Sequence, residues 1–365
     1  MFKKPLFILF SLATMFSQAQ EKTTEAYYWS MPFRESPYIQ IKGVNPMSAE
    51  QAKSTNHYRL VYDESNRLVE YSFRVGDQLK DPSHHWYTEP GFIMAPKTII
   101  TWQGNKEIRA YYNAAGKRIS VGSVWEEIVQ YNNKGQRVFL VYNNEEGQPA
   151  ENHNGVYHYL WSHHDKNSVV ESRFNADGKP VATRDRFEYL TVRLNYNDEG
   201  WLSLIEHLDP DGFKLKPDSS GAAQNKFTYD PCGNFIEWRV MDVNGNTVIG
   251  TTGVAFENQF YDVKGRLVNA KFFDAEGEQI ALPWGPYSRK QVYDEFGNNV
   301  RDVFLDKHGN KANSKLGVAE TTTRWSEDGV RLLEKKTMWT KTANWKTFRG
   351  EGWQDVSIFI IKTTR

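Results

Sequence analysis

The stretch FYDVKGRLVNAKFFDAEGEQI, residues Phe260 to Ile280, contains two Asp-x-x-Gly tetrads set twelve residues apart. The first runs from Asp262 to Gly265 and the second from Asp274 to Gly277. Such tetrads can be metal loops, carboxylates paired for catalysis, or turns of the backbone. The choice decides the fold, because the same arrangement recurs along most of the chain.

Two sets of regularly spaced glycines run through the sequence, and the second member of each pair follows the first by twelve residues. The first set is Gly104, Gly135, Gly200, Gly233, Gly265, Gly297 and Gly329, and the second is Gly116, Gly147, Gly178, Gly212, Gly245, Gly277 and Gly309. Successive copies are 31 to 34 residues apart. A fixed period of this length is typical of a repeat architecture.

Turn chemistry accounts for the tetrads without a metal or a reaction. Asp or Asn at the first position can accept hydrogen bonds from the backbone that follows, and glycine at the fourth position takes the left-handed conformation that closes a hairpin with a bulge. Asn66 occupies the glycine position in an early copy and tolerates positive φ. Lys166 occupies it in another copy, so either Asn167 serves with a shift of one residue or that hairpin is strained.

Between the paired turns, about eight residues alternate in polarity as in a strand with one buried face. Val268, Ala270 and Phe272 share one face, whereas Asn269 and Lys271 share the other. The sequence therefore predicts an all-β fold. It is an antiparallel β-hairpin repeat array of about nine units of 31–34 residues, forming an open curved sheet or a short solenoid.

The organisation along the chain follows from where the repeats begin and end. We expect the repeats at 58–341, with an insertion at 81–97, an N-terminal cap segment at 20–57 and a C-terminal capping strand segment at 342–365. A short helix is predicted near Ser48 to Ser54. Residues 1–19 have two lysines, a short apolar run and a small-x-small end, which predicts a signal peptide cleaved near Ala19.

Composition narrows the classes of function. The chain has 45 basic and 45 acidic residues, and the predicted leader carries two of the lysines, so the mature chain is nearly neutral. This charge does not favour a nucleic-acid partner or an anionic membrane. No second apolar stretch reaches the length of a transmembrane segment. We therefore expect a secreted or periplasmic protein, and Cys232, the only cysteine, as a small residue in a turn.

Units such as YDVKGRLVNAKFFDAEGEQI and YDEFGNNVRDVFLDKHGNKA resemble the YD repeats of RHS-type bacterial surface proteins, and they are similar in logic to MORN-like hairpin arrays. The resemblance covers about three quarters of the chain. It implies an exported bacterial array of β-hairpins that serves as a scaffold, with no catalytic residue. RHS shells are built from far longer chains, so an enclosing function does not carry over.

No candidate metal or catalytic site stands out from the repeats. The calcium-like stretches Asp209 to Gly212 and Asp242 to Asn246 lack the distal glutamate of an EF-hand. Adjacent histidines on a strand point to opposite faces, so neither His84-His85 nor His163-His164 is expected to chelate one ion. The neighbouring pairs Glu126-Glu127 and Glu145-Glu146 do not establish a pairing across a substrate. We predict no cofactor and no metal.

Aromatic residues are the more informative candidates. The tyrosines that recur once per copy should stack into a row, either buried between hairpins or exposed to a ligand. Tryptophans outside the repeat pattern, Trp86, Trp201 and Trp284, are better candidates for ligand binding. His163 and His164 are also candidates, because in their copy Lys166 stands where most other copies have the first glycine. Structural turns are assigned to Asp262, Gly265, Asp274, Gly277, Asp294 and Gly297.

These observations favour an exported, non-enzymatic repeat protein that binds a protein or glycan partner at the cell envelope through its sheet face or loops. The alternative is an enzyme or accessory protein acting on extracellular polysaccharide, with its site in the insertion and in the irregular copy near residues 161–167. A third alternative is a purely structural element of the envelope.

Overall fold

The computed structural model describes residues 23–33, 35–82, 95–163, 165–182, 188–283, 285–315, 317–339, 344–349 and 352–357, with side chains as far as residue 337. The predicted signal peptide and most of the predicted insertion lie outside these residues. The described chain forms one antiparallel sheet of 24 strands with a single short helix. The predicted all-β hairpin array is therefore confirmed.

The strands follow the order of the chain. The first elements are β1 (Thr24–Ser30), β2 (Val44–Met47), α1 (Ala49–Ala52), β3 (Asn56–Tyr62), β4 (Leu68–Val75), β5 (Gln78–Leu79), β6 (Lys97–Gln103), β7 (Lys106–Tyr112), β8 (Glu126–Tyr131), β9 (Arg137–Asn143), β10 (Pro149–Ala150), β11 (His158–His163) and β12 (Ser168–Phe174). The later ones are β13 (Thr191–Tyr196), β14 (Leu202–Leu208), β15 (Gln224–Tyr229), β16 (Phe235–Met241), β17 (Phe256–Tyr261), β18 (Leu267–Phe273), β19 (Ser288–Tyr293), β20 (Asn299–Leu305), β21 (Val318–Trp325), β22 (Leu332–Trp339), β23 (Asn344–Arg349) and β24 (Gly352–Ser357).

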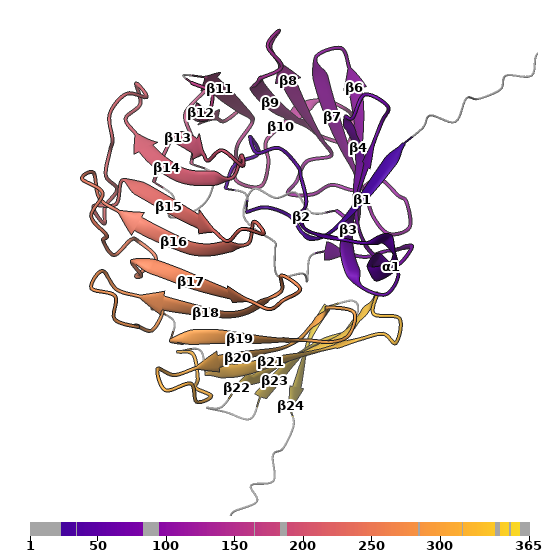
Figure 1. The fold of residues 1–365 in the computed structure, drawn as a ribbon, viewed down its shortest axis with the longest axis vertical. Helices are drawn as coiled ribbons and strands as arrows, with labels where there is room; N and C mark the ends of the chain where they lie inside the picture. The colour runs from indigo at the N-terminus through magenta and orange to yellow at the C-terminus, as the bar shows by residue number, and fades with distance from the viewer. Residues whose placement is uncertain are drawn as a thin grey trace, which may run out of the picture.

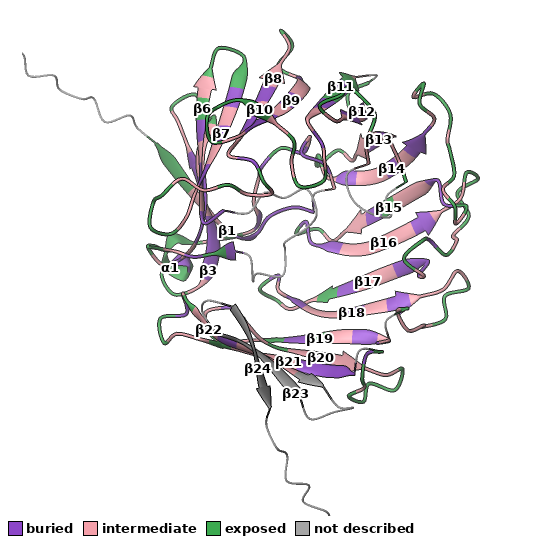
Figure 2. Cartoon of the chain, turned by 180° about the vertical axis from the view of Figure 1, so that it is seen from behind, coloured by how far each residue is buried: buried purple, intermediate pink, exposed green. Residues whose placement is uncertain are grey.

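Most strands pair with the strands before and after them in sequence, and β1 joins the array by pairing with both β2 and β3. The short strands β5 and β10 pair only with β4 and β9, so the main ladder continues from β4 to β6 and from β9 to β11. The hairpins succeed one another around an arc, so the sheet is strongly curved, and the indigo chain between β1 and β2 lies near its middle (Figure 1). Among the described strands, the ladder runs from β2 at one end to β24 at the other without closing. Buried residues gather on the strands and on the N-terminal segments (Figure 2).

The turns explain why these residues form hairpins. In the first tetrad, the Asp262 carboxylate accepts hydrogen bonds from the backbone N–H groups of Lys264 (2.9 Å) and Arg266 (3.0 Å). Gly265 has φ of 76° and donates its N–H to the Asp262 carbonyl. The register shifts between Phe260 and Tyr261, just before the turn, which is the bulge expected for this hairpin. Asp274–Gly277 and Asp294–Gly297 form the same backbone turn.

The exceptions to the glycine rule have different outcomes. Asn66 takes φ of 57°, as expected for a residue that replaces glycine. Neither Lys166 nor Asn167 has positive φ. Among the described residues, the non-glycine residues that do are Asn45, Asn66 and Ser123. Both explanations offered for the irregular copy are therefore wrong. The β11–β12 hairpin closes differently, with His163 opposite Val169 and no register shift between the two strands.

A third turn in most copies was not predicted. The link after the second turn closes a further turn, in which the N–H of a glycine bonds the carbonyl three residues earlier. These turns end at Gly155, Gly221, Gly253, Gly285 and Gly317, all with positive φ. The spacing of eight or nine residues after the second-set glycine was the overlooked signal.

Helix α1 is short, and it lies where it was predicted. Ser48 is its N-cap: the Ser48 hydroxyl accepts from the Gln51 N–H (3.2 Å), and the Gln51 side chain accepts from the Ser48 N–H (2.8 Å). This reciprocal arrangement satisfies two of the donors that a helix start leaves open.

A buried lysine connects the first hairpin to the last ones. Lys80 is 2% exposed, and its ammonium group donates to the Asn56 side chain (3.0 Å), the Asn298 side chain and the Gly329 carbonyl (2.7 Å). It also lies 4.0 Å from the centroid of the Trp325 ring. We call these five residues the Lys80 clasp. Because Asn56 begins β3 whereas the other partners belong to the last repeats, the clasp holds the two ends of the arc together.

The two glycine sets should respond differently to alanine. A Cβ on Gly277 would have no neighbour within 4 Å, whereas a Cβ on Gly265 would overlap the Asn45 side chain. Both positions have positive φ, which costs about 1–2 kcal/mol for alanine. We expect Gly265→Ala to lower the free energy of unfolding by more than Gly277→Ala, measured by urea denaturation. Equal losses would contradict the close packing of the first turns against the N-terminal segment.

The Lys80 clasp predicts a pH dependence of stability. Burial lowers the pKa of Lys80 to about 7 in the folded protein, against an unfolded value of about 10.5. Between these values the unfolded chain binds more protons, so stability should rise with pH by up to about 1.4 kcal/mol per unit. Lys80→Met should remove this slope in urea unfolding at pH 7.5, 8.5 and 9.5. The same slope in both proteins would show that Lys80 is not its source.

Candidate functional site

The inner face of the curved sheet is covered in part by the segment from Trp29 to Asn45, which we call the N-terminal segment. Phe33 packs against Phe227 and Phe235, with ring centroids 4.8 and 4.5 Å away. Farther along the segment, Tyr38 lies 5.4 Å from the ring of Trp161. The segment therefore inserts its own aromatic side chains into the core of the array.

Polar contacts fix the same segment to successive repeats. Arg137 donates to the carbonyls of Tyr38 (2.5 Å) and Ile39 (2.8 Å), and Lys42 donates to the Glu199 carbonyl (2.6 Å). These contacts span repeats far apart in sequence, so the position of the segment depends on the curvature of the whole sheet.

Two hollows lie beside this segment among the described residues. The first, which we call the inner pocket, has a volume of about 390 Å³ and is lined by Phe33 and Glu35 of the segment and by residues of β14 to β17 and the links beside them. The second hollow, of about 370 Å³, is lined by Tyr38 to Gln40 and by the first turns around β8, β12 and β13. Both volumes lie within the range of small-ligand sites.

Aromatic and aliphatic side chains form the larger part of the inner pocket. They come from β14, β15 and β16, from the chain just before β13 and from the N-terminal segment. They are Phe33, Tyr189, Ile205, Phe227, Phe235, Trp238 and Val240. The Trp238 indole donates to the Asn225 side chain at 2.8 Å, which fixes the orientation of the ring.

A neutral hydrogen-bond chain extends from this tryptophan. Asn225 donates to the ring nitrogen Nε2 of His207 at 2.8 Å, and His207 is fully buried. Burial lowers the pKa of His207 to about 3, so the ring is neutral at physiological pH. This chain orients polar groups in the pocket wall and adds no charge to it.

Glu257 is the carboxylate that faces the inner pocket from β17. Burial raises the pKa of Glu257 above the ordinary value, while Gln259 donates to its carboxylate at 3.0 Å. Tyr261 in turn donates to the Gln259 side chain at 2.7 Å. These three residues occupy alternate positions of one strand, so all of them lie on its inner face.

Asp218 is a second carboxylate of the pocket, but its hydrogen bonds are committed to a turn. Its oxygens accept from Tyr189 (2.6 Å), from the backbone and hydroxyl of Ser220 and from the backbone of Ala222. The pKa of Asp218 is lowered: burial acts to raise it, and the bonds from Ser220 and Tyr189 outweigh burial together. Asp218 is therefore an ionised turn cap that borders the pocket.

The second hollow contains His163, one of the predicted site residues. His163 ends β11, and its Nε2 lies 2.7 Å from the Arg137 carbonyl. Tyr196 lines the same hollow, and its hydroxyl has no hydrogen-bond partner among the described residues. His164 lies outside the described residues. The structure thus places His163 beside a hollow, but it does not show a pair of histidines acting together.

Trp201, another predicted ligand residue, packs within the array. Its ring lies 5.3 Å from the ring of Tyr229, and the Lys42 ammonium lies 5.4 Å from its centroid. A Cβ on Gly233 would overlap the indole. Trp201 therefore connects one first turn to the next and to the N-terminal segment. The other predicted tryptophans, Trp86 and Trp284, lie outside the described residues, and their roles stay predictions.

The recurrent tyrosines form hydrogen-bonded rungs between repeats. Tyr229, Tyr261 and Tyr293 donate to the carbonyls of Leu202 (2.8 Å), Phe235 (2.8 Å) and Leu267 (2.7 Å), each in the preceding repeat. Trp325 makes the equivalent bond to the Asn299 carbonyl at 3.2 Å. The tyrosine row is thus part of the structure that joins neighbouring hairpins.

Of the carboxylate pairs in the sequence, Glu145-Glu146 lies in the turn after β9, and Glu126-Glu127 is separated by strand β8. Glu127 points inward and is buried with Arg109 (2.8 Å), whereas Glu126 pairs with Arg118 (2.7 Å). Adjacent strand residues face opposite sides, so the two carboxyl groups cannot flank one substrate. In the part of the chain that the structure describes, no group of three or more His, Cys, Asp or Glu side chains is arranged to hold a metal ion.

Sequence reasoning did not identify Glu257 or Trp238 as site residues. The available signal was the position four residues before each first-turn aromatic, which holds Glu127, Val192, Asn225, Glu257, Arg289 and Thr321 in successive copies. This position varies in charge while its surroundings repeat. Comparing the copies would have pointed to Glu257, although only the structure shows the cavity beside it.

No protein-family model matches the sequence, and no curated protein sequence matches it. Among solved structures, the chain is similar to TcdB2-TccC3-TEV (15% identity, TM-score 0.30) and to TcdB2-TccC3 (13% identity, TM-score 0.24). The matches cover 84% and 82% of this chain, but only 13% and 14% of those chains. A third similarity is to dihydro-heme d1 dehydrogenase NirN, with 12% identity, coverage of 91% and 65%, and a TM-score of 0.20.

The hydrogen bonds between repeats predict different effects on stability when the hydroxyl is removed from Tyr261 and from Tyr196. Tyr261→Phe removes a hydroxyl that donates to the Phe235 carbonyl and to Gln259, and we expect a loss of about 0.5–1.5 kcal/mol in the free energy of unfolding. Tyr196→Phe removes a buried hydroxyl without a partner among the described residues and should be neutral or stabilising. Chemical denaturation measures both. A larger loss for Tyr196→Phe would contradict the assignment.

Proposed function

We infer that this chain is an exported, non-enzymatic repeat protein that binds a protein or glycan partner through its inner face. The observation that carries the proposal is the inner pocket. The N-terminal segment fills part of the concave side with its own side chains, yet a cavity of about 390 Å³ remains between Phe33 and β17.

The lining of this cavity supports binding. Ligand sites are mostly apolar with a few oriented polar groups. The inner pocket has an aromatic wall with Asn225, Gln259 and Glu257 held in place by hydrogen bonds to their neighbours. Such groups orient a ligand without further ordering of the protein, which lowers the cost of binding.

Export is part of the proposal and rests on the sequence of the first nineteen residues. None of the described helices is long and apolar enough to cross a membrane. A mature protein that starts near residue 20 and is found in the periplasm or the medium would agree with the proposal, and N-terminal sequencing of the native protein is the measurement.

An enzyme acting on polysaccharide is the second candidate, and one observation favours it. The inner pocket contains two carboxyl groups whose pKa values are shifted in opposite directions, raised for Glu257 and lowered for Asp218. Pairs of this kind serve as acid and base in hydrolases. Binding is the better supported function because Asp218 is already saturated by its own turn. Release of reducing ends from a polysaccharide, abolished by Glu257→Gln, would favour the enzyme.

We expect Trp238→Ala to weaken binding of the partner at least tenfold, because it removes the largest ring of the pocket wall. The assay is saturable binding to a glycan array and to immobilised envelope proteins, with thermal unfolding as a check of the fold. Thr252→Trp serves as a second variant, since it adds bulk at an exposed position of the rim.

The matched control is Phe260→Ala. Phe260 lies on β17 like Glu257, but its side chain is 43% exposed on the outer face. We expect this variant to bind as the unchanged protein does. Binding that persists in Trp238→Ala and in Thr252→Trp would remove the inner pocket from the proposed function.

A further inference from the structure

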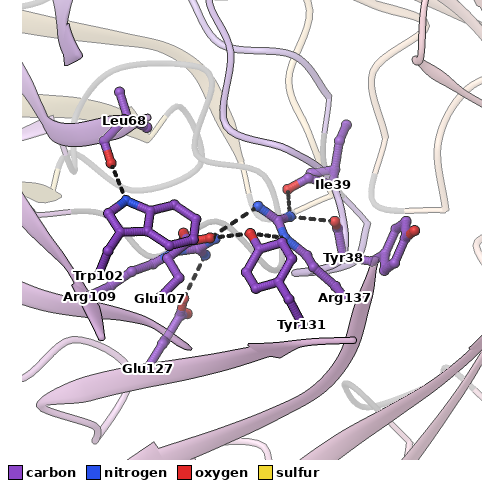
Figure 3. A network of polar contacts seen from close by, with 9 residues as sticks. All are labelled: Tyr38, Ile39, Leu68, Trp102, Glu107, Arg109, Glu127, Tyr131 and Arg137. Atoms are coloured by element: carbon purple, nitrogen blue, oxygen red, sulfur yellow. Dashed lines mark hydrogen bonds and ion pairs between the residues drawn. The ribbon is translucent and has the colours of Figure 1, made fainter. Parts of the chain in front are cut away.

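Buried carboxylates elsewhere on the inner face have a cation beside them, and the described lining of the inner pocket lacks one. In the repeat that contains β7 and β8, Glu127 stands directly opposite Arg109, and the guanidinium donates to it at 2.8 Å. Arg109 also donates to Glu107 at 2.6 Å, and both side chains are fully buried (Figure 3). A buried carboxylate is tolerated there because a cation stands beside it.

Glu257 occupies the equivalent position in a later repeat. Glu127 lies four residues before Tyr131, and Glu257 lies four residues before Tyr261. Each has an aromatic residue opposite it on the following strand, Tyr142 for Glu127 and Phe272 for Glu257. The two sites therefore share their position in the sheet and one of their two neighbours.

The other neighbour differs. Where Glu127 faces Arg109 on the preceding strand, Glu257 faces Trp238. Arg289 is a basic residue whose charge acts to lower the pKa of Glu257, and its guanidinium forms an ion pair with Asp302 at 3.0 Å. No described lysine or arginine forms an ion pair with Glu257, and none of the described pocket-lining residues is basic. Beside Glu257, the Trp238 ring and an open cavity stand where Arg109 stands beside Glu127.

This arrangement suits an incoming cation. The face of a tryptophan attracts a guanidinium or ammonium group, and the attraction is stronger when both are removed from water. Asp218 adds negative charge to the same cavity, while the phenylalanines would cover the alkyl stem of a long side chain. A planar guanidinium can also bind a carboxylate through two parallel hydrogen bonds.

We propose that the inner pocket receives an arginine side chain of a partner protein, whose guanidinium stands beside Glu257 as Arg109 stands beside Glu127. This proposal rests on the proposed function and selects a protein, not a glycan, as the partner. The aromatic residue at position 238 leaves open the space that arginine fills in the other repeat.

The test uses the full mature chain and two small probes of nearly the same shape. Nα-acetyl-argininamide carries the guanidinium, and Nα-acetyl-citrullinamide replaces it with a neutral urea group. We expect the first to bind, with shifts of tryptophan indole signals in NMR titration, and the second to bind at least tenfold more weakly. Equal binding of both probes, or no binding of the arginine probe, would overturn the proposal.

Two variants locate the site. Glu257→Gln keeps the shape and the hydrogen bond with Gln259 but removes the charge, and it should weaken the arginine probe at least tenfold. Trp238→Arg recreates the pair found at Arg109 and Glu127, so it should abolish binding while leaving the thermal midpoint near that of the unchanged protein. Phe260→Ala is the control and should bind normally. Normal binding by Glu257→Gln would place the probe elsewhere and contradict the proposal.

The outcomes separate this proposal from the function on which it rests. Saturable binding of a neutral glycan that is lost in Trp238→Ala, without binding of the arginine probe, would overturn the arginine proposal and keep the inner pocket as a binding site. If partner binding is unchanged in every pocket variant, both proposals are wrong.

Discussion

The structure depends on one backbone constraint, the left-handed glycine that closes most of the hairpins. An Asp or Asn at the start of the turn accepts hydrogen bonds from the following N–H groups, and the glycine three residues later completes the reversal at positive φ. Because these turns recur at a regular spacing, each strand from β13 to β20 has the same length as its counterpart in the next copy within that range. The inward and outward faces are thereby set for the whole array, since a shift of one residue would exchange them.

Curvature gives the two faces different roles. The tyrosine that precedes each first turn reaches back to a carbonyl of the preceding repeat, so neighbouring hairpins are joined by side chains as well as by the strand ladder. Residues Trp29 to Asn45 cover part of the concave side. Their contacts reach turns from Arg137 to Gly297, so this segment stabilises the arc by connecting repeats that are distant in sequence. The Lys80 clasp adds a connection between the ends.

The buried charges of the inner face show how a thin core can hold polar residues. Glu107, Glu127 and Glu171 are each accompanied by an arginine, which offsets the cost of removing a carboxylate from water. Glu257 departs from this pattern at an equivalent position, and the departure coincides with the unfilled cavity. In a repeat protein, such a difference between copies is informative because the surrounding backbone is nearly constant. At this position the carboxylate lacks the stabilising arginine of its counterparts, and a binding site is expected where a repeat departs from its pattern in this way.

The sequence alone determined the local structure: the hairpins, the two main turns, the strand polarity and the helix start at Ser48 all follow from interactions between residues a few positions apart. The spacing of the glycines also contained the signal for the third turn, although that turn was not predicted from the sequence. What only the tertiary structure decided was the site. Trp201 looked available because it lay outside the pattern, but the fold packs it against Lys42 and Gly233. Trp238 and Glu257 looked like ordinary strand residues, but curvature and the path of the N-terminal segment left a cavity beside them. Side-chain spacing predicts which face a residue occupies, whereas the empty volume on that face depends on contacts between segments far apart in the chain.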